Sequence, residues 1–454
     1  MLIELVQEAA AEAPEQPVLI SSVRSLSYRQ CQGRAEAVAR GLHERGIERF
    51  GSAVEAPADI LVAVVAASAC GAEACVYPRD LDAAGIGRFA QRFGHPVVLT
   101  DEGQALDGAH RVALYELERE VGRAAPLPNP GHAPVLILTT GSTGEPKGAR
   151  HDWARLVHAV RRPDIRPGAR WLLAYSLNQF AGVQIMLHAL ASRAALVVPP
   201  TRRAEDVIDA IREHRVTHAS ATPTLWRLIV GRLDDETARQ LPLEQITLGG
   251  EAAPERLIER LGKLFPLARI SHVYAGTEFG SVVSVRDGHS GLPASILERD
   301  ESADVRFRIL DGELQISSRV GMLGYHGADD EPSDWRATGD LVEVRGDRIQ
   351  FVGRTTEIIN VGGAKVHPLP VEEVVCSVEG VQLAAVYGRP NPITGQIVAV
   401  DVVVAPGIDT EALTARIRAA CEALPAAGRP RRIRFVEELE TRGHKLIRQE
   451  TAAG

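Results

Sequence analysis

The chain has 454 residues, of which 45% are hydrophobic and 24% charged, and its formal net charge is −8. One hydrophobic core rarely serves a chain of this length, so we expect a globular protein with more than one packed unit. The acidic balance excludes a general electrostatic affinity for nucleic acid, and we predict no nucleic-acid partner.

Cysteine usage and the first residues bear on the cellular compartment. The cysteines form no Cys-x-x-Cys pair; they are Cys31, Cys70, Cys75, Cys376 and Cys421. This spacing argues against zinc ribbons and a disulfide scaffold, and favours a reducing compartment. The N-terminal residues carry acids rather than a basic segment, so no signal peptide is predicted and we expect a cytoplasmic protein.

Residues 60–77 form an apolar stretch that resembles a membrane span in length. Gly71 and Glu73 interrupt it, and neither a basic flank nor an aromatic belt accompanies it. The stretch therefore predicts a buried helix followed by a strand, and we expect no membrane partner.

Short β-rich runs alternate with helical patterns along most of the chain. Buried strands are predicted at 133–140, 170–176, 194–200, 216–223 and 245–251, and helices at 203–215 and 253–265. Strands separated by helices of this kind are typical of βαβ units, which build a largely parallel sheet.

The pattern changes after about residue 300. Residues 305–318 and 341–353 each predict a strand–turn–strand unit, with Asp-Gly and Gly-Asp turns. Strand and helix patterns mix again beyond 356, ending with a helix at 410–424. We predict an α/β fold: a large N-terminal domain (1–353), with mostly parallel sheets flanked by helices plus a small β subdomain, followed by a small α+β C-terminal domain (354–454).

A glycine-rich loop, TTGSTGEPKG at 139–148, directly follows the strand predicted at 133–140. Ligands bind at the carboxyl ends of strands in open α/β sheets. Backbone N–H groups, hydroxyls and the Lys147 ammonium suit a phosphate, although the spacing differs from the common P-loop. A surface turn of the same composition is the competing interpretation.

Further motifs decide between these interpretations. YAGTE occupies 274–278, ATGDL occupies 337–341, GRTTEIINVGGAKVHP occupies 353–368, and TRGHKLIR occupies 441–448. Together with the loop and with LSYRQ at 26–30, these stretches resemble, in order, the motifs of the adenylate-forming superfamily. That superfamily includes acyl-CoA synthetases, aryl-acid ligases and the adenylation domains of peptide synthetases.

The resemblance implies a two-step reaction: a carboxylate and ATP give an acyl-adenylate and pyrophosphate, and a thiol then takes the acyl group. It assigns Glu278 to Mg²⁺, Thr277 to a phosphate, Tyr274 to adenine stacking, and Asp340 with Arg354 to the ribose. The implied nucleotide-binding residues also include those of the loop and two turns: Thr139, Thr140, Gly141, Ser142, Thr143, Gly144, Lys147, Gly250, Glu251, Ala252 and Ala275.

Lys445 is the residue that the resemblance places at the first chemical step. An ammonium beside the α-phosphate and the substrate carboxylate offsets their mutual repulsion in the transition state. With Thr277 and Glu278 it completes the predicted catalytic set. Composition alone would favour a surface lysine among arginines, and the motif decides against that interpretation.

The chain departs from the superfamily pattern in the C-terminal region. Thr356 stands at the hinge position, where Asp or Lys is usual and where the C-terminal unit rotates between half-reactions. Pro370 replaces a usual Glu while Glu372 keeps the second acid, and His444 replaces the glycine before Lys445. No catalytic group is lost, but these departures bear on the thioester-forming step.

The substrate segment is predicted at 175–186, next to YAGTE. Asn178, Gln179 and Phe180 offer no acid for an α-ammonium, so we predict a small carboxylic acid without an α-amino group, aromatic or short and polar. Gly249 and Gly276 would complete the pocket. A preference for amino acids would require an acid from elsewhere, such as Glu251 or Asp287.

The acceptor thiol is left open between coenzyme A and the phosphopantetheine of a separate acyl-carrier protein. Two different functions also stay open: an enzyme that makes an acyl-adenylate without a thioester step, and a catalytically inactive nucleotide-binding regulator. Thr356 and Pro370 are the only support for the former, and the retained Lys147, Asp340 and Lys445 argue against the latter.

Overall fold

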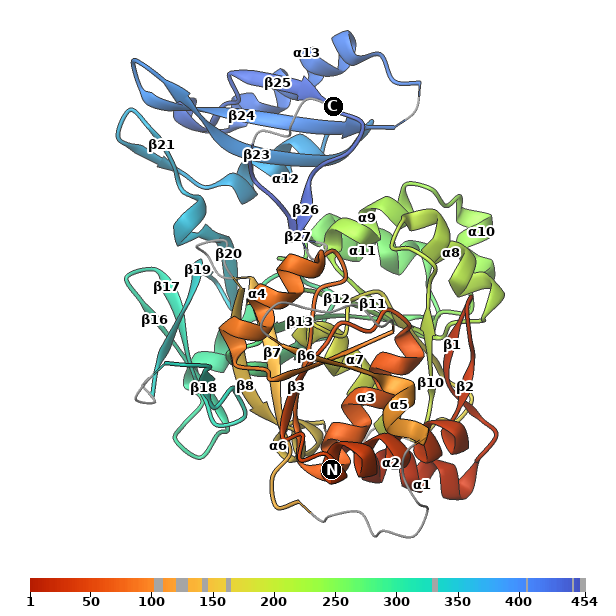
Figure 1. The fold of residues 1–454 in the computed structure, drawn as a ribbon. Helices are drawn as coiled ribbons and strands as arrows, with labels where there is room; N and C mark the ends of the chain where they lie inside the picture. The colour runs from red at the N-terminus through yellow and green to blue at the C-terminus, as the bar shows by residue number, and fades with distance from the viewer. Residues whose placement is uncertain are drawn as a thin grey trace.

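The computed structural model describes residues 1–101, 109–119, 130–140, 146–160, 165–328, 334–405, 407–442 and 445–449. Two domains are evident in Figure 1, where the blue C-terminal domain stands above the sheets of a larger N-terminal domain. A strand pair near the C-terminus, β26 (Thr441–Arg442) and β27 (Lys445–Leu446), extends down from the small domain to the large one.

Two mostly parallel sheets organise the larger domain. The first has the order β14-β13-β12-β11-β9-β10-β1-β2, with antiparallel pairing at its two ends. Its strands are β1 (Pro17–Ser21), β2 (Leu26–Ser27), β9 (Arg170–Leu173), β10 (Ala195–Val198), β11 (His218–Ala221), β12 (Gln245–Gly249), β13 (Arg269–Gly276) and β14 (Gly280–Val285).

The second sheet has the order β18-β8-β7-β4-β3-β5-β6 and is parallel except for the β7–β8 and β8–β18 pairs. Its strands are β3 (Arg49–Ser52), β4 (Glu73–Val76), β5 (Val97–Thr100), β6 (His110–Ala113), β7 (Pro134–Thr140), β8 (Pro146–Asp152) and β18 (Gly324–Tyr325). The parallel sheets, and the strands predicted at 133–140, 170–176, 194–200, 216–223 and 245–251, are confirmed to within a few residues.

Helices connect and cover these strands. In the larger domain they are α1 (Leu2–Glu12), α2 (Tyr28–Glu44), α3 (Pro57–Cys70), α4 (Ala83–Phe93), α5 (Leu114–Arg119), α6 (Trp153–Ala159), α7 (Phe180–Ala191), α8 (Ala204–Glu213), α9 (Pro223–Val230), α10 (Asp235–Gln240) and α11 (Glu255–Leu264). One hydrophobic cluster joins α1, α2, α3 and α7 to strands of both sheets. The apolar stretch 60–77 therefore belongs to α3 and β4, whose apolar side chains are buried in the core.

Within the described residues, no helix combines the length and apolar character needed to cross a membrane.

A β subdomain follows, with the order β15-β20-β19-β17-β16 and its own hydrophobic cluster. Its elements are β15 (Leu292–Pro293), η1 (Ala294–Glu298), β16 (Val305–Leu310), β17 (Glu313–Ser318), β19 (Arg336–Arg345) and β20 (Arg348–Arg354). Both predicted strand–turn–strand units lie here. β20 ends at Arg354, the last residue before the short helix η2 (Thr355–Glu357) that leads into the C-terminal domain.

The C-terminal domain is a small α+β unit. Its sheet has the order β22-β21-β24-β23, with β25 paired to β24. The elements are β21 (Ile359–Val361), β22 (Ala364–Val366), α12 (Pro368–Cys376), β23 (Val381–Asn391), β24 (Gly395–Val404), α13 (Thr410–Ala420), η3 (Cys421–Ala423), η4 (Ala426–Gly428) and β25 (Arg432–Phe435). Pro370 fits the first turn of α12, where backbone N–H groups have no partner inside the helix.

Gly182 fixes how α7 approaches the chain segment that precedes it. A Cβ at this position would lie 2.1 Å from the backbone oxygen of Ser176. We therefore expect Gly182→Ala to lower the thermal midpoint, with a cost of about 1–3 kcal/mol for forced overpacking. Gly262 in α11 is the matched control, because a Cβ there meets nothing within 4 Å. Gly262→Ala should instead raise the midpoint, since alanine is favoured over glycine in a helix by roughly 0.5–1 kcal/mol. Equal shifts of both variants in differential scanning calorimetry would contradict this account.

Candidate active site at the domain boundary

The strands β7 and β8 hold both ends of the predicted phosphate loop. They pair antiparallel, with Thr139 opposite Lys147 and Thr140 opposite Pro146. The loop between them, and with it the predicted residues Gly141, Ser142, Thr143 and Gly144, lies outside the described residues, as does the side chain of Thr140. The loop ends are thus fixed at one edge of the second sheet, and Lys147 is exposed there.

Tyr325 joins two of the predicted site residues. Its hydroxyl donates a hydrogen bond to Glu278 Oε1 at 2.8 Å, and the Lys147 ammonium lies 5.2 Å from its ring centroid, within cation–π range. Tyr325 lies on β18, which pairs with β8. The carboxylate and the ammonium predicted to face the phosphates are therefore held against the same tyrosine.

Thr277 and Glu278 form the turn between β13 and β14. The carbonyl of Thr277 accepts a hydrogen bond from His151 Nε2 at 2.9 Å. Burial lowers the pKa of His151 to about 4, so the imidazole is neutral near pH 7 and carries its proton on Nε2. The His151 ring also stacks on Phe180, with 5.6 Å between centroids. His151 thereby connects the strand after the phosphate loop to both Thr277 and the predicted substrate segment.

Asp340 lies opposite Arg354 in the β19–β20 ladder. Its Oδ1 is 3.1 Å from Arg354 Nε, and its Oδ2 accepts a hydrogen bond from the Tyr274 hydroxyl at 2.7 Å. Burial raises the pKa of the Asp340 carboxyl, and the Arg354 guanidinium opposes that shift. The ring of Tyr274 packs on Phe351 at 5.1 Å between centroids. The predicted ribose and adenine residues are therefore one connected group.

The turn after β12 faces the C-terminal domain. Gly250 has φ of +85°, and a Cβ built there would lie 3.4 Å from Lys445 Cε. The neighbouring Glu251 carboxylate accepts hydrogen bonds from Thr224 and from the backbone N–H of Leu446, which belongs to β27. Gly249, at the end of β12, accepts a hydrogen bond from the Tyr175 hydroxyl at 3.0 Å. Ala252 follows in the same turn, and Ala275 lies opposite Ser281 in the β13–β14 pair.

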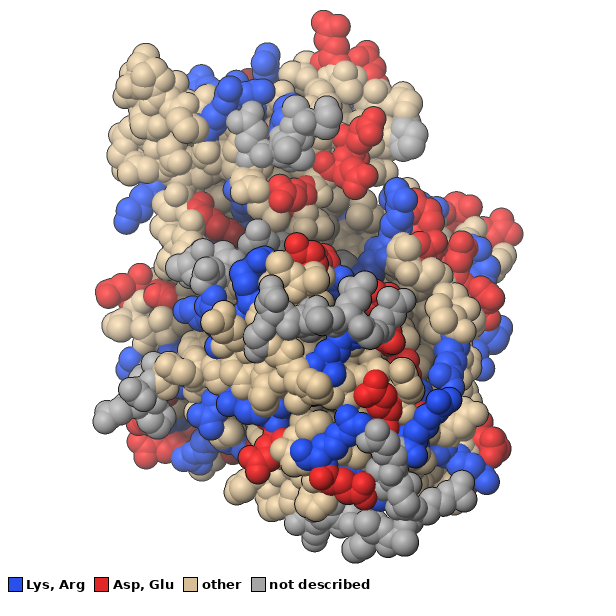
Figure 2. Space-filling view, viewed as in Figure 1, with Lys and Arg blue, Asp and Glu red and all other residues tan. Residues whose placement is uncertain are grey.

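Lys445 lies on β27, in the strand pair that reaches from the small domain to the large one, and its side chain is exposed. Figure 2 shows a hollow between the C-terminal domain and the helices below it. Desolvation and the Arg354 guanidinium lower the pKa of the Lys445 ammonium, against the opposite influence of Glu251, Asp340 and Glu278. These interactions place Lys445 among the carboxylates of the larger domain. The lysine that the sequence placed in the small domain therefore converges with the nucleotide residues predicted in the large one.

Arg448 anchors the other end of the same segment to the C-terminal domain. Its guanidinium donates to both oxygens of Glu372, at 2.8 and 2.9 Å, and to Glu357 at 2.9 Å. Glu372 also accepts from the backbone N–H of Val386. Charge pairing with Glu372 and Glu357 outweighs burial and raises the pKa of Arg448. The strand pair that carries Lys445 is thus attached on both sides.

Comparison with known families identifies this arrangement. The AMP-binding enzyme family matches residues 6–326, and the AMP-binding enzyme C-terminal domain matches residues 370–445. The chain belongs to the AMP-binding enzyme family. Both matched regions contain residues of the candidate site, with Lys445 in the second.

Curated relatives within the AMP-binding family are distant. The 4-chlorobenzoate–CoA ligase of Pseudomonas sp. (strain CBS-3) is 26% identical over 72% of this chain and 67% of its own length. A medium/long-chain-fatty-acid–[acyl-carrier-protein] ligase of Mycobacterium tuberculosis (strain ATCC 25618 / H37Rv) is 26% identical over 100% of this chain and 95% of its own. The chain spans 33% of the isonitrile lipopeptide synthase of Streptomyces coeruleorubidus, to which it is 28% identical over its full length.

Solved structures share the fold. A crystal structure of an anthranilate CoA ligase in complex with anthranoyl-AMP has a TM-score of 0.84 and 20% sequence identity, covering 98% of this chain and 95% of that one. At this identity the likeness shows the fold of an adenylate-forming enzyme, including its two domains.

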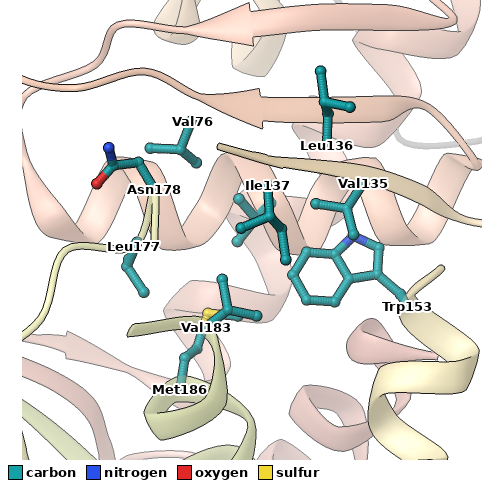
Figure 3. A pocket seen from close by; sticks show the side chains of 10 residues that line it. Val76, Val135, Leu136, Ile137, Trp153, Leu177, Asn178, Val183 and Met186 are labelled. Atoms are coloured by element: carbon teal, nitrogen blue, oxygen red, sulfur yellow. The ribbon is translucent and has the colours of Figure 1, made fainter. Parts of the chain in front are cut away.

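The predicted substrate residues lie beside this family site. Phe180 begins α7 and contacts His151, while Gln179 is the N-cap residue of that helix without a capping side-chain hydrogen bond. Gly276 ends β13, next to Thr277. Asn178 borders a small apolar cavity among α3, β4, β7 and α7, lined also by Val76, Val135, Ile137, Val183 and Met186 (Figure 3). Its volume of about 10 Å³ is near the minimum for one water molecule, so this cavity is a gap in the core rather than a substrate pocket.

Metal binding in the AMP-binding family site would depend on few protein ligands. Among the residues that the structure describes, no group of three or more His, Cys, Asp or Glu side chains is placed to hold a metal ion. The Glu278 carboxylate lies beside Tyr325, on the strand that pairs with β8 at the phosphate-loop edge. This donor set suits Mg²⁺, which takes one or two carboxylates together with substrate phosphates and water.

Sequence reasoning did not find Tyr325, His151 or Thr224. His151 and Tyr325 lie outside the motifs, and Thr224 is separated from Glu251 by a helix and a strand. Only the three-dimensional packing reveals their contacts with Glu278, Thr277 and Glu251. The proximity of His151 to the loop, three residues past Gly148, was the one available signal.

The lowered pKa of Lys445 generates a direct test. The chain has four lysines, Lys147, Lys263, Lys365 and Lys445, so reductive methylation with ¹³C-formaldehyde gives few signals to assign. The signal that is absent from Lys445→Arg belongs to Lys445. We expect this signal to titrate with a pKa below the ordinary lysine value of 10.5. Desolvation disfavours the ammonium, so the proton leaves at lower pH. Titration of this signal at or above 10.5 in NMR spectra would contradict the packing of Lys445 in the hollow.

Proposed function

We propose that the chain is an acid–thiol ligase that activates a carboxylic acid with ATP and passes the acyl group to a thiol. The observation that carries the proposal is that β27 reaches the larger domain, with the Leu446 N–H bonded to Glu251 and the stem of Lys445 over Gly250, on the side of the Asp340–Arg354 pair. The Lys445 ammonium suits a phosphate and a carboxylate, the Asp340–Arg354 pair suits a ribose, and the Glu278 carboxylate suits a metal ion. Together these groups fit a nucleoside triphosphate beside a substrate carboxylate. Membership in the AMP-binding family supports the same reaction.

In the first step, a carboxylate oxygen of the acid attacks the α-phosphorus of ATP. The new acyl–phosphate bond forms as the bond between the α-phosphorus and the bridging oxygen breaks, and pyrophosphate leaves with that electron pair. Both reactants are anions, so the protein contributes mainly orientation and positive charge. Lys445 supplies that charge at the reacting phosphate, Lys147 supplies it at the leaving phosphates, and Asp340 accepts hydrogen bonds from the ribose hydroxyls.

Glu278 would hold Mg²⁺, and the chemistry that this ion would supply is positive charge at the phosphates. Tyr325 orients that carboxylate through its hydrogen bond to Oε1 and contacts Lys147 with its ring face. Thr277 is held in place through the hydrogen bond from His151 to its carbonyl, which leaves its hydroxyl available to a phosphate oxygen.

In the second step, the sulfur of the acceptor thiol attacks the acyl carbon, and AMP leaves as the acyl–phosphate bond breaks. The acceptor is coenzyme A or the phosphopantetheine of a separate carrier protein. Both kinds of ligase occur among the relatives, which include a CoA ligase and an acyl-carrier-protein ligase. Parallel assays with coenzyme A and with a phosphopantetheinylated carrier separate the two.

The substrate is a carboxylic acid without an α-amino group, aromatic or short and polar. Asn178, Gln179 and Phe180 carry no charge, and the His151 ring that stacks on Phe180 is neutral. The acids that could serve an ammonium are engaged elsewhere. Glu251 accepts hydrogen bonds from Thr224 and Leu446, and Asp287 pairs with Arg348 at 2.6 Å. A relative that activates 4-chlorobenzoate and a structure holding anthranoyl-AMP support an aryl acid.

Exchange of radiolabelled pyrophosphate into ATP tests the proposed first step. We expect exchange that requires Mg²⁺ and a suitable acid, with aryl, short polar, fatty and amino acids compared side by side. Lys445→Ala should slow it by about 10²–10³-fold, the range for removal of a positioned transition-state charge, while calorimetry shows ATP affinity nearly unchanged. A protein that binds no MgATP would refute the proposal, and equal exchange in Lys445→Ala would remove Lys445 from it.

Matched acids test the substrate class. A phenylpropanoic acid should be used at least about tenfold better than phenylalanine, which corresponds to roughly 1.4 kcal/mol. The reason is that an α-ammonium buried without a carboxylate loses its hydration uncompensated. The comparison is made with specificity constants for adenylate formation. A clear preference for the amino acid would show that a carboxylate enters the pocket.

A further inference from the structure

We infer that Glu251 is a positioning residue for adenylate formation: it fixes the strand that carries Lys445 against the larger domain. This inference rests on the proposed function. It concerns how a lysine from one domain is held at a reacting phosphate bound by the other.

Glu251 contacts two elements that are far apart in the sequence. Its Oε2 accepts hydrogen bonds from the backbone N–H of Thr224 at 3.0 Å and from the Thr224 hydroxyl at 2.7 Å. Its Oε1 accepts the backbone N–H of Leu446 at 2.9 Å. Leu446 is the residue after Lys445 in β27. The carboxylate thus bridges the first turn of α9 and the lysine strand.

The Thr224 contact makes Glu251 a rigid support. Backbone N–H groups in the first turn of a helix have no partner inside the helix and attract anions. Thr224 is the second residue of α9, and its side chain is buried. Held at this end, the carboxylate presents its other oxygen to the C-terminal domain in a fixed place.

The hydrogen bond from the Leu446 N–H to Glu251 also orients the side chain of Lys445. Side chains of successive residues in an extended strand point to opposite sides, so fixing the N–H of Leu446 fixes the direction in which Lys445 projects. The stem of Lys445 then passes over Gly250, at van der Waals distance from a Cβ built there, and the positive φ of Gly250 is what favours glycine at this position. Leu446 and Leu228 of α9 both pack against one hydrophobic cluster of the C-terminal domain, which supports the same placement.

Glu251→Gln isolates this role. An amide offers one oxygen, so a glutamine that keeps Thr224 turns its NH₂ group toward the N–H of Leu446, donor against donor. Thr224→Val is the matched control, because it removes the hydroxyl contact with Glu251 and leaves the Leu446 contact intact. We expect Glu251→Gln to slow pyrophosphate exchange by about 10–100-fold, the scale for a displacement of about 1 Å at a reacting group. Thr224→Val should stay within about twofold of wild type.

Three readouts separate positioning from a general structural effect. First, the double variant Glu251→Gln/Lys445→Ala should be no more than about twofold slower than Lys445→Ala, because a residue that acts through Lys445 has nothing left to position. Second, thioester formation from a chemically synthesised acyl-adenylate should stay within about twofold of wild type in Glu251→Gln. The slowing should also persist at the lower-pH plateau of the rate profile, which excludes a mere change in the Lys445 pKa.

Leu446→Pro tests the same hydrogen bond from its other partner and serves if Glu251→Gln does not fold. It removes the N–H donor, and an extended conformation at Lys445 is compatible with a following proline. The same selective loss of exchange is expected. The inference would be overturned if Glu251→Gln or Leu446→Pro exchanged pyrophosphate as fast as Thr224→Val. Additive losses in the double variant would overturn it as well. A wild-type protein without exchange for any acid would instead refute the proposed function.

Discussion

The arrangement of the candidate site depends on one electrostatic constraint: an ammonium of the small domain lies among carboxylates of the large one. Lys445 lies close enough to Glu251, Asp340 and Glu278 for each to favour its charged form, while desolvation and Arg354 disfavour it. Such a balance is sensitive to geometry, because the interaction between two charges depends on the distance between them. The bound nucleotide would add further negative charge at the same place. The surrounding hydrogen bonds hold these charged groups in place.

Those hydrogen bonds connect elements that are distant from each other in the sequence. Tyr274 and Arg354 hold Asp340 from two strands, Tyr325 holds Glu278 from a third, and His151 holds Thr277 from a fourth. Each supporting group contacts a half-buried polar residue of the site. The supports named here lie on strands, which favours precise placement of the groups that they hold.

Local sequence patterns were sufficient for much of the fold, because period and turn chemistry are local properties. The strands at 133–140 and 245–251, the helix at 253–265 and the Asp-Gly turn at 311–312 each follow from a short window of residues. Only the resemblance of the motifs to those of a family predicted that Asp340 and Lys445 belong to one site. The supports Tyr325, Thr224 and Arg448 depend on contacts across tens of residues, and no periodicity encodes such contacts. Pro370 shows the converse: it departs from the family pattern, yet its position in the first turn of α12 accommodates it.

Arg448 and Glu251 connect β27, the strand that carries Lys445, to different domains. The partners of Arg448, Glu357 and Glu372, both follow the hinge position at Thr356, so a turn of the small domain about that position would carry the ion pairs with it unbroken. The bond from Leu446 to Glu251 spans the two bodies and would have to open. The same holds for the contacts of Arg227 and Arg256 with Cys376 and Ser377. Arg448 therefore attaches the strand to the C-terminal domain itself, and Glu251 attaches it to the larger domain. In a rotation of the C-terminal domain, Lys445 would move together with that domain once the cross-domain hydrogen bonds had opened.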